Sequence, residues 1–220
     1  LGCTEPAAIA LSASLASKAV NGKVLSVEVL LDPNTFKNAS AVHIPKAVGY
    51  VGPEIAAALG AIRGNPKLKL QVLRNVREKD LEKAKLLLEK GEVRIGLNHA
   101  KRGLWVQAKV TTTKGKGEAI ISGYHSHIYR VKSNGKITFR EKPFRPSNHI
   151  HGKIARLSIL EIYNMVKRLK ANDKEFLLEG LDVNMAIAHE GILKKSGLGV
   201  GAFFRGQMDK KILAEDVIGE

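Results

Sequence analysis

The 220-residue chain is poor in cysteine, in aromatic residues and in long apolar runs. It contains one cysteine, Cys3, so an internal disulfide is excluded, which fits a reducing compartment such as the cytoplasm. Aromatic residues make up 5% of the sequence. Nowhere do about 18 apolar residues follow one another without a charge, as a membrane-spanning helix requires. We therefore expect a cytoplasmic protein that has no membrane partner.

Acidic residues are also scarce, and the formal net charge is +15. Residues 67–102 carry both signs, which is typical of a solvated helix face. Residues 130–156 are mostly basic, with aromatic residues between the charges. Such a strip can bind single-stranded nucleic acid, guide a small carboxylate, or do neither. Because no named nucleic-acid motif is present, we expect a small-molecule substrate, and a basic nucleic-acid-binding module without catalysis stays the alternative.

The N-terminal residues combine the single thiol with signals for the start of a helix. Thr4 is a candidate N-cap, Glu5 favours the helix dipole, and Pro6 needs no N–H partner in the first turn. An alanine-rich apolar run follows as far as Val20. A thiol at a helix N-terminus favours its thiolate form, which is a nucleophile and a ligand for soft metals and iron–sulfur clusters. The alternative is a buried Cys3 that packs as a small apolar residue.

Gly2-Cys3-Thr4-Glu5-Pro6, followed by the alanine-rich helix, resembles the N-terminal signature of the iron–sulfur L-cysteine desulfidases and the related L-serine dehydratase alpha chains. Further segments continue the resemblance in the family's order. They are Lys37-Asn38 with Val42-His43-Ile44-Pro45, Gly52 with Ala56-Ala57-Ala58-Leu59-Gly60, Gly117-Glu118-Ala119 with His125 to Ile128, and Asn184-Met185-Ala186-Ile187-Ala188.

The resemblance implies a lyase in which three cysteines hold a [4Fe–4S] cluster and leave one iron open to the substrate. L-Cysteine would yield pyruvate, ammonia and sulfide, and the alternative substrate, L-serine, would lose water instead. Cys3 would be a cluster ligand, with Thr4 and Glu5 beside the cofactor. The resemblance places the other cysteine ligands in a later segment, so we expect this chain to be part of a longer protein. A fragment that folds but binds no cluster is a further alternative.

The resemblance also suggests catalytic residues, none of which can be named as the general base. Lys37 and Asn38 can bind a carboxylate, although a turn with a surface lysine is the simpler interpretation. His125 and His127 stand two apart on a predicted strand and would share one face, where they could bind a metal or an anion or shuttle protons. Asn148-His149-Ile150-His151 repeats that spacing. A zinc site is less favoured because no cysteine or acidic residue is placed to complete it.

Hydrophobic periodicity predicts an α+β fold. Segments 1–66 and 151–220 are expected to form a helical catalytic core, and segment 67–150 an inserted α+β lobe with an antiparallel meander. The sequence leaves open whether identical copies of the chain assemble into an oligomer. We predict strands at 23–31, 68–73, 92–97, 103–113, 117–131 and 136–140, a loop with a short strand at 36–46, and helices at 7–20, 53–62, 78–89, 153–170 and 203–218.

Overall fold

The computed structural model describes residues 3–44, 47, 49–144, 152–194 and 199–209. It divides into two compact units, Leu1–Ser147 and Asn148–Glu220, which we describe separately as unit 1 and unit 2. The candidate site lies within unit 1.

Unit 1 is built on a six-stranded sheet in the order β2-β1-β3-β4-β5-β6. β1 pairs in parallel with β2 and antiparallel with β3, and β3 to β6 follow one another as an antiparallel meander. The α+β class and the predicted meander are therefore confirmed. The strands are β1 (Val24–Leu31), β2 (Val93–Leu97), β3 (Trp105–Thr112), β4 (Gly115–Ser122), β5 (Ile128–Ser133) and β6 (Lys136–Arg140).

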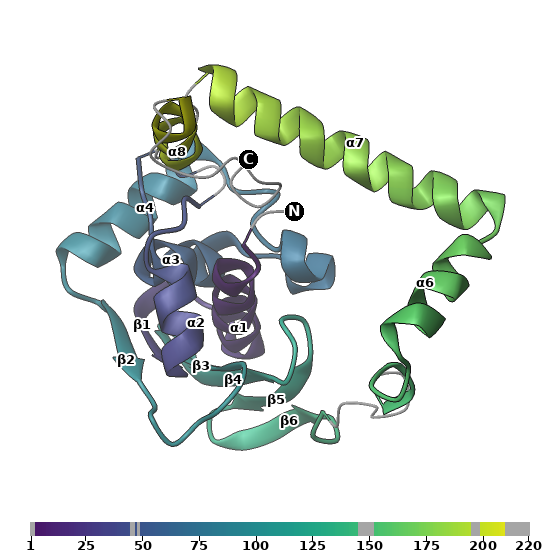
Figure 1. The fold of residues 1–220 in the computed structure, drawn as a ribbon. Coiled ribbons are helices and arrows are strands. Elements are labelled where there is room, and N and C mark those ends of the chain that lie inside the picture. The colour runs from purple at the N-terminus through teal and green to yellow at the C-terminus, as the bar shows by residue number, and fades with distance from the viewer. Residues whose placement is uncertain (1–2, 45–46, 48, 145–151, 195–198, 210–220) are drawn as a thin grey trace. The chain divides into compact units, whose positions relative to one another are not determined.

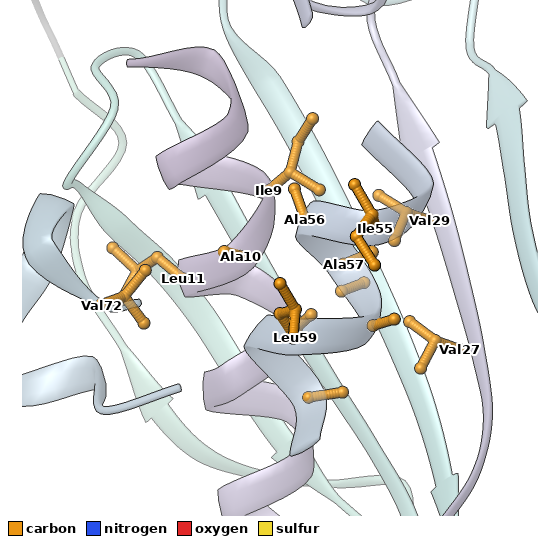
Figure 2. Packing of buried hydrophobic residues seen from close by; sticks show 14 of the residues in the cluster. Ile9, Ala10, Leu11, Val27, Val29, Ile55, Ala56, Ala57, Leu59 and Val72 are labelled. Carbon is orange, nitrogen blue, oxygen red and sulfur yellow. The ribbon is translucent and has the colours of Figure 1, made fainter. Parts of the chain in front are cut away.

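Helices cover one face of this sheet. Along β1, Val27 and Val29 are buried while Glu28 and Leu30 are exposed, the alternation of a strand with one face toward a core. Helix α1 packs against β3, β4 and β5 and against α3, as Figure 1 shows, and the apolar side chains of α1, α3 and β1 form one core (Figure 2). The main helices are α1 (Glu5–Val20), α2 (Pro33–Ala39), α3 (Pro53–Arg63) and α4 (Glu78–Glu89).

Small residues let α1 approach its neighbours closely. A Cβ at Gly60 of α3 would overlap the backbone of Ala10, and one at Gly117 of β4 would overlap the carbonyl of Ala16. The buried Ser12 hydroxyl donates to the Ala119 carbonyl (3.0 Å) and accepts from the Ala108 N–H (3.2 Å). These contacts hold α1 at the centre of unit 1, with its N-terminal end presented at one edge.

The other face of the sheet carries a row of alternating charges. The register places Glu28 opposite Lys109, Lys109 opposite Glu118, and Glu118 opposite Lys132. Glu118 also pairs with Arg130 at 2.8 Å and with Lys132 at 3.5 Å. Cross-strand pairs of opposite charge stabilise a sheet modestly. Two cations of the basic stretch 130–156 are thus paired within the sheet.

Three local predictions are wrong. Segment 68–73 is not a strand: Pro66–Gln71 forms a 3₁₀ helix, η1, whose start is capped by the Asn65 side chain. The expected loop at 36–46 overlaps α2, because Asp32 and Pro33 form a helix start. The expected strand at 117–131 is two strands, since Gly123 turns the chain with a φ of +91°, a conformation that favours glycine.

Unit 2 consists of α6 (Ile159–Lys167), α7 (Ala171–Lys194) and α8 (Val200–Asp209). Ser158 and Glu161 form a capping box at the start of α6, so the main helix begins later than the predicted residue 153. The predicted helix at 203–218 overlaps α8 through Asp209, and its remainder lies outside the described residues. No helix in the part of the chain that the structure describes is long and apolar enough to cross a membrane.

Segment 1–66 does not stand apart from segment 67–150, because β1 pairs with β2 and β3 and α1 packs on β3 to β5. A helical core shared by 1–66 and 151–220 stays a prediction.

Candidate functional site

Three segments that are far apart in the sequence meet at the N-terminal end of α1. Cys3 lies just before this helix and Glu5 is its first residue. Asn38 lies in the last turn of α2, and His125 lies in the turn between β4 and β5. A thiol, a carboxylate, an amide and an imidazole are thereby brought together, and we call these four residues the Glu5 cluster.

Asp32 anchors α2, which carries Asn38. Its buried carboxylate accepts hydrogen bonds from the backbone N–H groups of Asn34 (3.0 Å), Thr35 (3.1 Å) and Trp105 (2.9 Å). The Thr35 hydroxyl also donates to it. A buried carboxylate is stable only with such partners, and here they tie the start of α2 to the start of β3. The position of Asn38 therefore depends on a residue outside the cluster.

The carboxylate of Glu5 is the centre of the cluster. The Cys3 thiol donates to Oε2 at 2.9 Å, and the Asn38 amide nitrogen donates to Oε1 at 2.8 Å. The Nε2 atom of His125 lies 3.7 Å from Oε1, which is too long for a hydrogen bond. The Cys3 sulfur also lies 3.7 Å from the Asn38 carbonyl oxygen. Cys3 and Asn38 are exposed, so the cluster is open to solvent.

These partners keep Glu5 ionised. Partial burial works to raise its pKa, but the hydrogen bonds from Cys3 and Asn38, its own backbone N–H and the nearby His125 ring outweigh burial and lower the pKa to about 2. Glu5 is therefore a carboxylate at any ordinary pH. It can accept hydrogen bonds or pair with a cation, but it is not suited to donate a proton.

The thiol of Cys3 behaves differently from the prediction. Partial burial, followed by the hydrogen bond and the negative charge of Glu5, raises the pKa of Cys3 above its ordinary value, and a backbone hydrogen bond opposes this only in part. The predicted preference for the thiolate is wrong for this arrangement, because an adjacent carboxylate disfavours a second negative charge. A metal ion that coordinated the sulfur would displace this proton to solvent, because coordination deprotonates a thiol.

The two histidines do not share a face, so that prediction is wrong. Both lie in the turn between β4 and β5, where the side-chain alternation of a strand does not apply. His125 faces Glu5, and its Nε2 atom is buried and makes no hydrogen bond within the described residues. His127 is buried elsewhere: Nδ1 lies 2.6 Å from the Ser122 carbonyl oxygen, and Nε2 lies 3.2 Å from Glu141.

His127 stabilises the turn that carries His125. Its ring belongs to a cluster with Tyr124 and Phe144, at centroid distances of 5.2 and 6.0 Å. Both of its ring nitrogens lie close to oxygen atoms of other residues, Ser122 and Glu141. These contacts help to hold the β4–β5 turn, which also carries His125.

None of the other described candidates makes a hydrogen bond or an ion pair with the Glu5 carboxylate. Lys37 is exposed on α2 and makes no hydrogen bond or ion pair to any described residue. Thr4 occupies the N-cap position of α1, but its side chain makes no capping hydrogen bond. The segment 148–151, with its two histidines, lies outside the described residues. Within the described ranges, no group of three or more His, Cys, Asp or Glu side chains could hold a metal ion.

Two residues that shape the site were not identified from the sequence. Asp32 is followed by Pro33, a pair typical of a helix start, and this signal could have identified α2. Glu141 had no comparable signal, because its contact with His127 depends on the path of the chain after β6.

The chain was compared with known proteins. It is 34% identical over 228 residues to a UPF0597 protein of Desulfatibacillum aliphaticivorans and 36% identical over 230 residues to one of Desulforapulum autotrophicum, each match covering 99% of this chain and 52% of the relative. A UPF0597 protein of Clostridium botulinum is 36% identical over 208 residues, which cover 91% of this chain and 47% of the relative. No family model and no solved structure matches.

This comparison corrects the family prediction. The motif around Cys3 and the further short segments along the chain indicated the iron–sulfur desulfidase and dehydratase family, but the matching relatives are named UPF0597 proteins and no family model supports that assignment. Separate short motifs are weaker support for a family than continuous similarity along the chain. The chain spans about half the length of the curated relatives it matches, and over almost all of its own length it is similar to UPF0597 proteins.

Proposed function

We propose that the chain contributes the Glu5 cluster to the active site of a lyase that acts on a small amino acid. L-Cysteine is the preferred substrate: loss of its α-proton and cleavage of its carbon–sulfur bond give sulfide and aminoacrylate, which water hydrolyses to pyruvate and ammonia. L-Serine is the alternative. The observation that carries the proposal is the convergence of Cys3, Asn38 and His125 on the single carboxylate of Glu5.

The cofactor in this proposal is a [4Fe–4S] cluster. Cys3 suits one coordination position, because its thiol is exposed beside the first turn of α1. It cannot hold a cluster alone, since clusters are usually held by several thiolates and Cys3 is the one cysteine of this sequence. The relatives are about twice as long as the matched region, which leaves room for further ligands. When bound, the cluster would act as a Lewis acid that withdraws charge from the leaving group.

The other residues of the Glu5 cluster would bind and orient the substrate. The Glu5 carboxylate, with its pKa of about 2, offers a fixed negative charge to the ammonium group of an amino acid. The Asn38 amide uses one donor on Glu5 and keeps a second N–H and its carbonyl oxygen for the substrate. Lys37, exposed on the same helix, supplies a positive charge for the substrate carboxylate.

His125 is the residue proposed to hold or move a proton. Its Nε2 atom is buried, makes no hydrogen bond among the described residues, and lies beside a permanent carboxylate. An imidazole at this position can donate a proton to a leaving group when Nε2 carries one, or accept one from the substrate when it does not. His127 would keep this ring in place through the β4–β5 turn.

The test uses the full-length protein purified without oxygen, with and without cluster reconstitution. We expect visible iron–sulfur absorption and pyruvate formation from L-cysteine, and both are lost in Cys3→Ala. His125→Asn should keep the absorption and lose activity, whereas Lys67→Ala, an exposed lysine on η1, should keep both. The ratio of rates with L-cysteine and L-serine ranks the two substrates.

The proposal fails if the reconstituted protein is colourless and inactive, or if Cys3→Ala retains full cluster content and activity. If the protein is active without a cluster, the proposed cofactor is wrong, but the proposed role of His125 can still hold. The activity of the His125→Asn variant then tests that role separately.

A further inference from the structure

A cavity lies at the opposite end of α1 from the Glu5 cluster. It has a volume of about 620 Å³ and opens where the C-terminal ends of α1, α3 and α4 meet the start of β1. This volume lies within the range of small-molecule sites, about 300–1,000 Å³. The cavity shares no lining residue with the Glu5 cluster, so it does not belong to the proposed active site.

The lining of this cavity carries positive charge and no negative charge. Lys18, Lys23, Lys83 and Lys90 line it, and no acidic side chain does. None of these four lysines forms an ion pair with another described residue, although the neighbouring Lys85 pairs with Glu82. Four like charges around one cavity repel one another, and an anion placed between them relieves that repulsion.

Helix capping does not account for the two lysines of α4, Lys83 and Lys90. Lysine often neutralises the free carbonyl groups at a helix C-terminus. In α4 those carbonyls already accept backbone N–H groups, with Gly91 donating to Leu88 at 2.9 Å and Glu92 donating to Leu87 at 3.0 Å. In α3, Gly64 donates to Leu59 and Gly60. Lys83 and Lys90 are therefore free to bind something else.

The cavity also has an apolar side. Leu86 of α4 is 53% exposed within it, and Ile62, Leu87 and Val24 are partly buried around it. Exposed leucine next to unpaired lysines matches a ligand that has an apolar body and an anionic head. We propose that this cavity binds a small organic anion of that class, with a carboxylate or phosphate head among the lysines and an aliphatic or aromatic body against Leu86 and Leu87.

The test is a titration of the 220-residue chain with octanoate, octyl phosphate and inorganic phosphate, followed by calorimetry and by amide chemical shifts. We expect octanoate or octyl phosphate to bind more tightly than inorganic phosphate, to shift resonances of α4 and the 21–24 turn, and to weaken as salt is added. The tighter of the two octyl compounds identifies the head group.

Matched double variants separate the cavity from general charge. Lys83→Glu with Lys90→Glu reverses two lining charges, and Lys67→Glu with Lys79→Glu reverses two exposed charges outside the lining. We expect the first pair to weaken binding by at least about tenfold, as the loss of two charge contacts implies, and the second to change it by less than about twofold. Circular dichroism checks that both variants fold.

Leu86→Gln provides a second test that needs no charge reversal. Because Leu86 is half exposed, this change should preserve the fold, weaken octanoate and octyl phosphate, and leave inorganic phosphate unchanged. Equal losses in the two lysine pairs, or equal affinity for inorganic phosphate and the octyl compounds, would overturn the proposal.

Discussion

Two helices of this chain are rich in apolar residues, yet their surroundings differ completely. In α1, 11 of 16 residues are buried, and many of them are alanine or serine. In α7, which has 24 residues, large side chains such as Phe176 (74% exposed) and Ile187 (67% exposed) face solvent. Because the buried residues of α1 are small, the sheet and a second helix can pack close to its backbone. The difference shows that unit 1 covers its own apolar surface, whereas the helices of unit 2 do not.

The size of the residues explains this contrast. A helix lined with alanine and serine buries little area per residue but lets backbones approach closely, so its stability comes from neighbours packed on several sides. A helix with large exposed apolar residues gains stability only when another surface covers them. Unit 1 therefore has the features of an independent folding unit, and unit 2 has the features of a segment that folds against something else.

The largest expected effect comes from separating the two units. We expect residues 1–147 to keep their sheet and to unfold cooperatively in urea, because the core lies within them. We expect residues 148–220 alone to lose most of their helix, since isolated helices without a packed face are marginal in water. Circular dichroism and urea titration of both pieces measure this. A cooperative transition in the 148–220 piece would remove the distinction.

The next effect compares one glycine in each unit. Gly60→Ala should destabilise unit 1 by about 2 kcal/mol, because the new Cβ would overlap the backbone of Ala10, and overpacking a core costs about 1–3 kcal/mol. Gly180→Ala in α7 meets no atom within 4 Å and should raise helix stability by up to about 1 kcal/mol. Urea unfolding of the full chain measures the effect of Gly60→Ala, and helical ellipticity measures the effect of Gly180→Ala.

Effects of the same sign from the two glycine variants would mean that α1 and α3 are not packed as closely as the structure shows. The pair therefore tests the contrast in packing directly.

The smallest effect compares a hydrogen-bonded glutamate in each unit. The folded-state pKa of Glu5 is lowered from 4.5 to about 2, so its contribution is fully present above pH 4.5 and is lost as the pH falls toward 2. Glu5→Gln should lower the free energy of unfolding at pH 7 by on the order of 1 kcal/mol, and the gap should close at pH 2. The Glu5 side chain is 16% exposed, but its partners Cys3 and Asn38 are exposed, so solvent screens part of this contribution.

Glu161 is the matched control in unit 2. Hydrogen bonds from the backbone and hydroxyl of Ser158 also lower its pKa, but its site is fully exposed. Glu161→Gln should change only the local helicity of α6 and should leave the urea transition of unit 1 in place. Stability curves from pH 2 to pH 8 measure both variants, and a pH-independent loss in Glu5→Gln would show that Glu5 acts through packing and not through its charge.

Much of the local structure could be predicted from the sequence, and the failures share one cause. The helix at 78–89 and the strand at 136–140 have the bounds expected from periodicity and from the turn residues beside them. Residues 68–73 alternate like a strand but form η1, because Pro66 and the Asn65 cap bend the chain first. The strand expected at 117–131 is interrupted at Gly123. In both cases a local backbone constraint overrode an apolar pattern.

The candidate site was predictable as a set of residues but not as a geometry. Cys3, Asn38 and His125 were all named from the sequence, and the structure brings them to Glu5. The protonation of Cys3 was predicted with the wrong sign, because the helix N-terminus was considered without the carboxylate beside it. His125 and His127 were expected on one face and point to different partners, because a turn has no two-residue alternation.

The sequence by itself determined the α+β class, the meander and the excess of positive charge, because these follow from periodicity and composition. The tertiary structure alone decided that β1 lies between β2 and β3, that Asp32 holds α2 in place, and that four lysines surround one cavity. Each of these contacts joins residues separated by tens of positions in the chain. Local propensities carry no information on contacts between residues so far apart in the sequence. The packing of α1 against the sheet decides which of these residues meet.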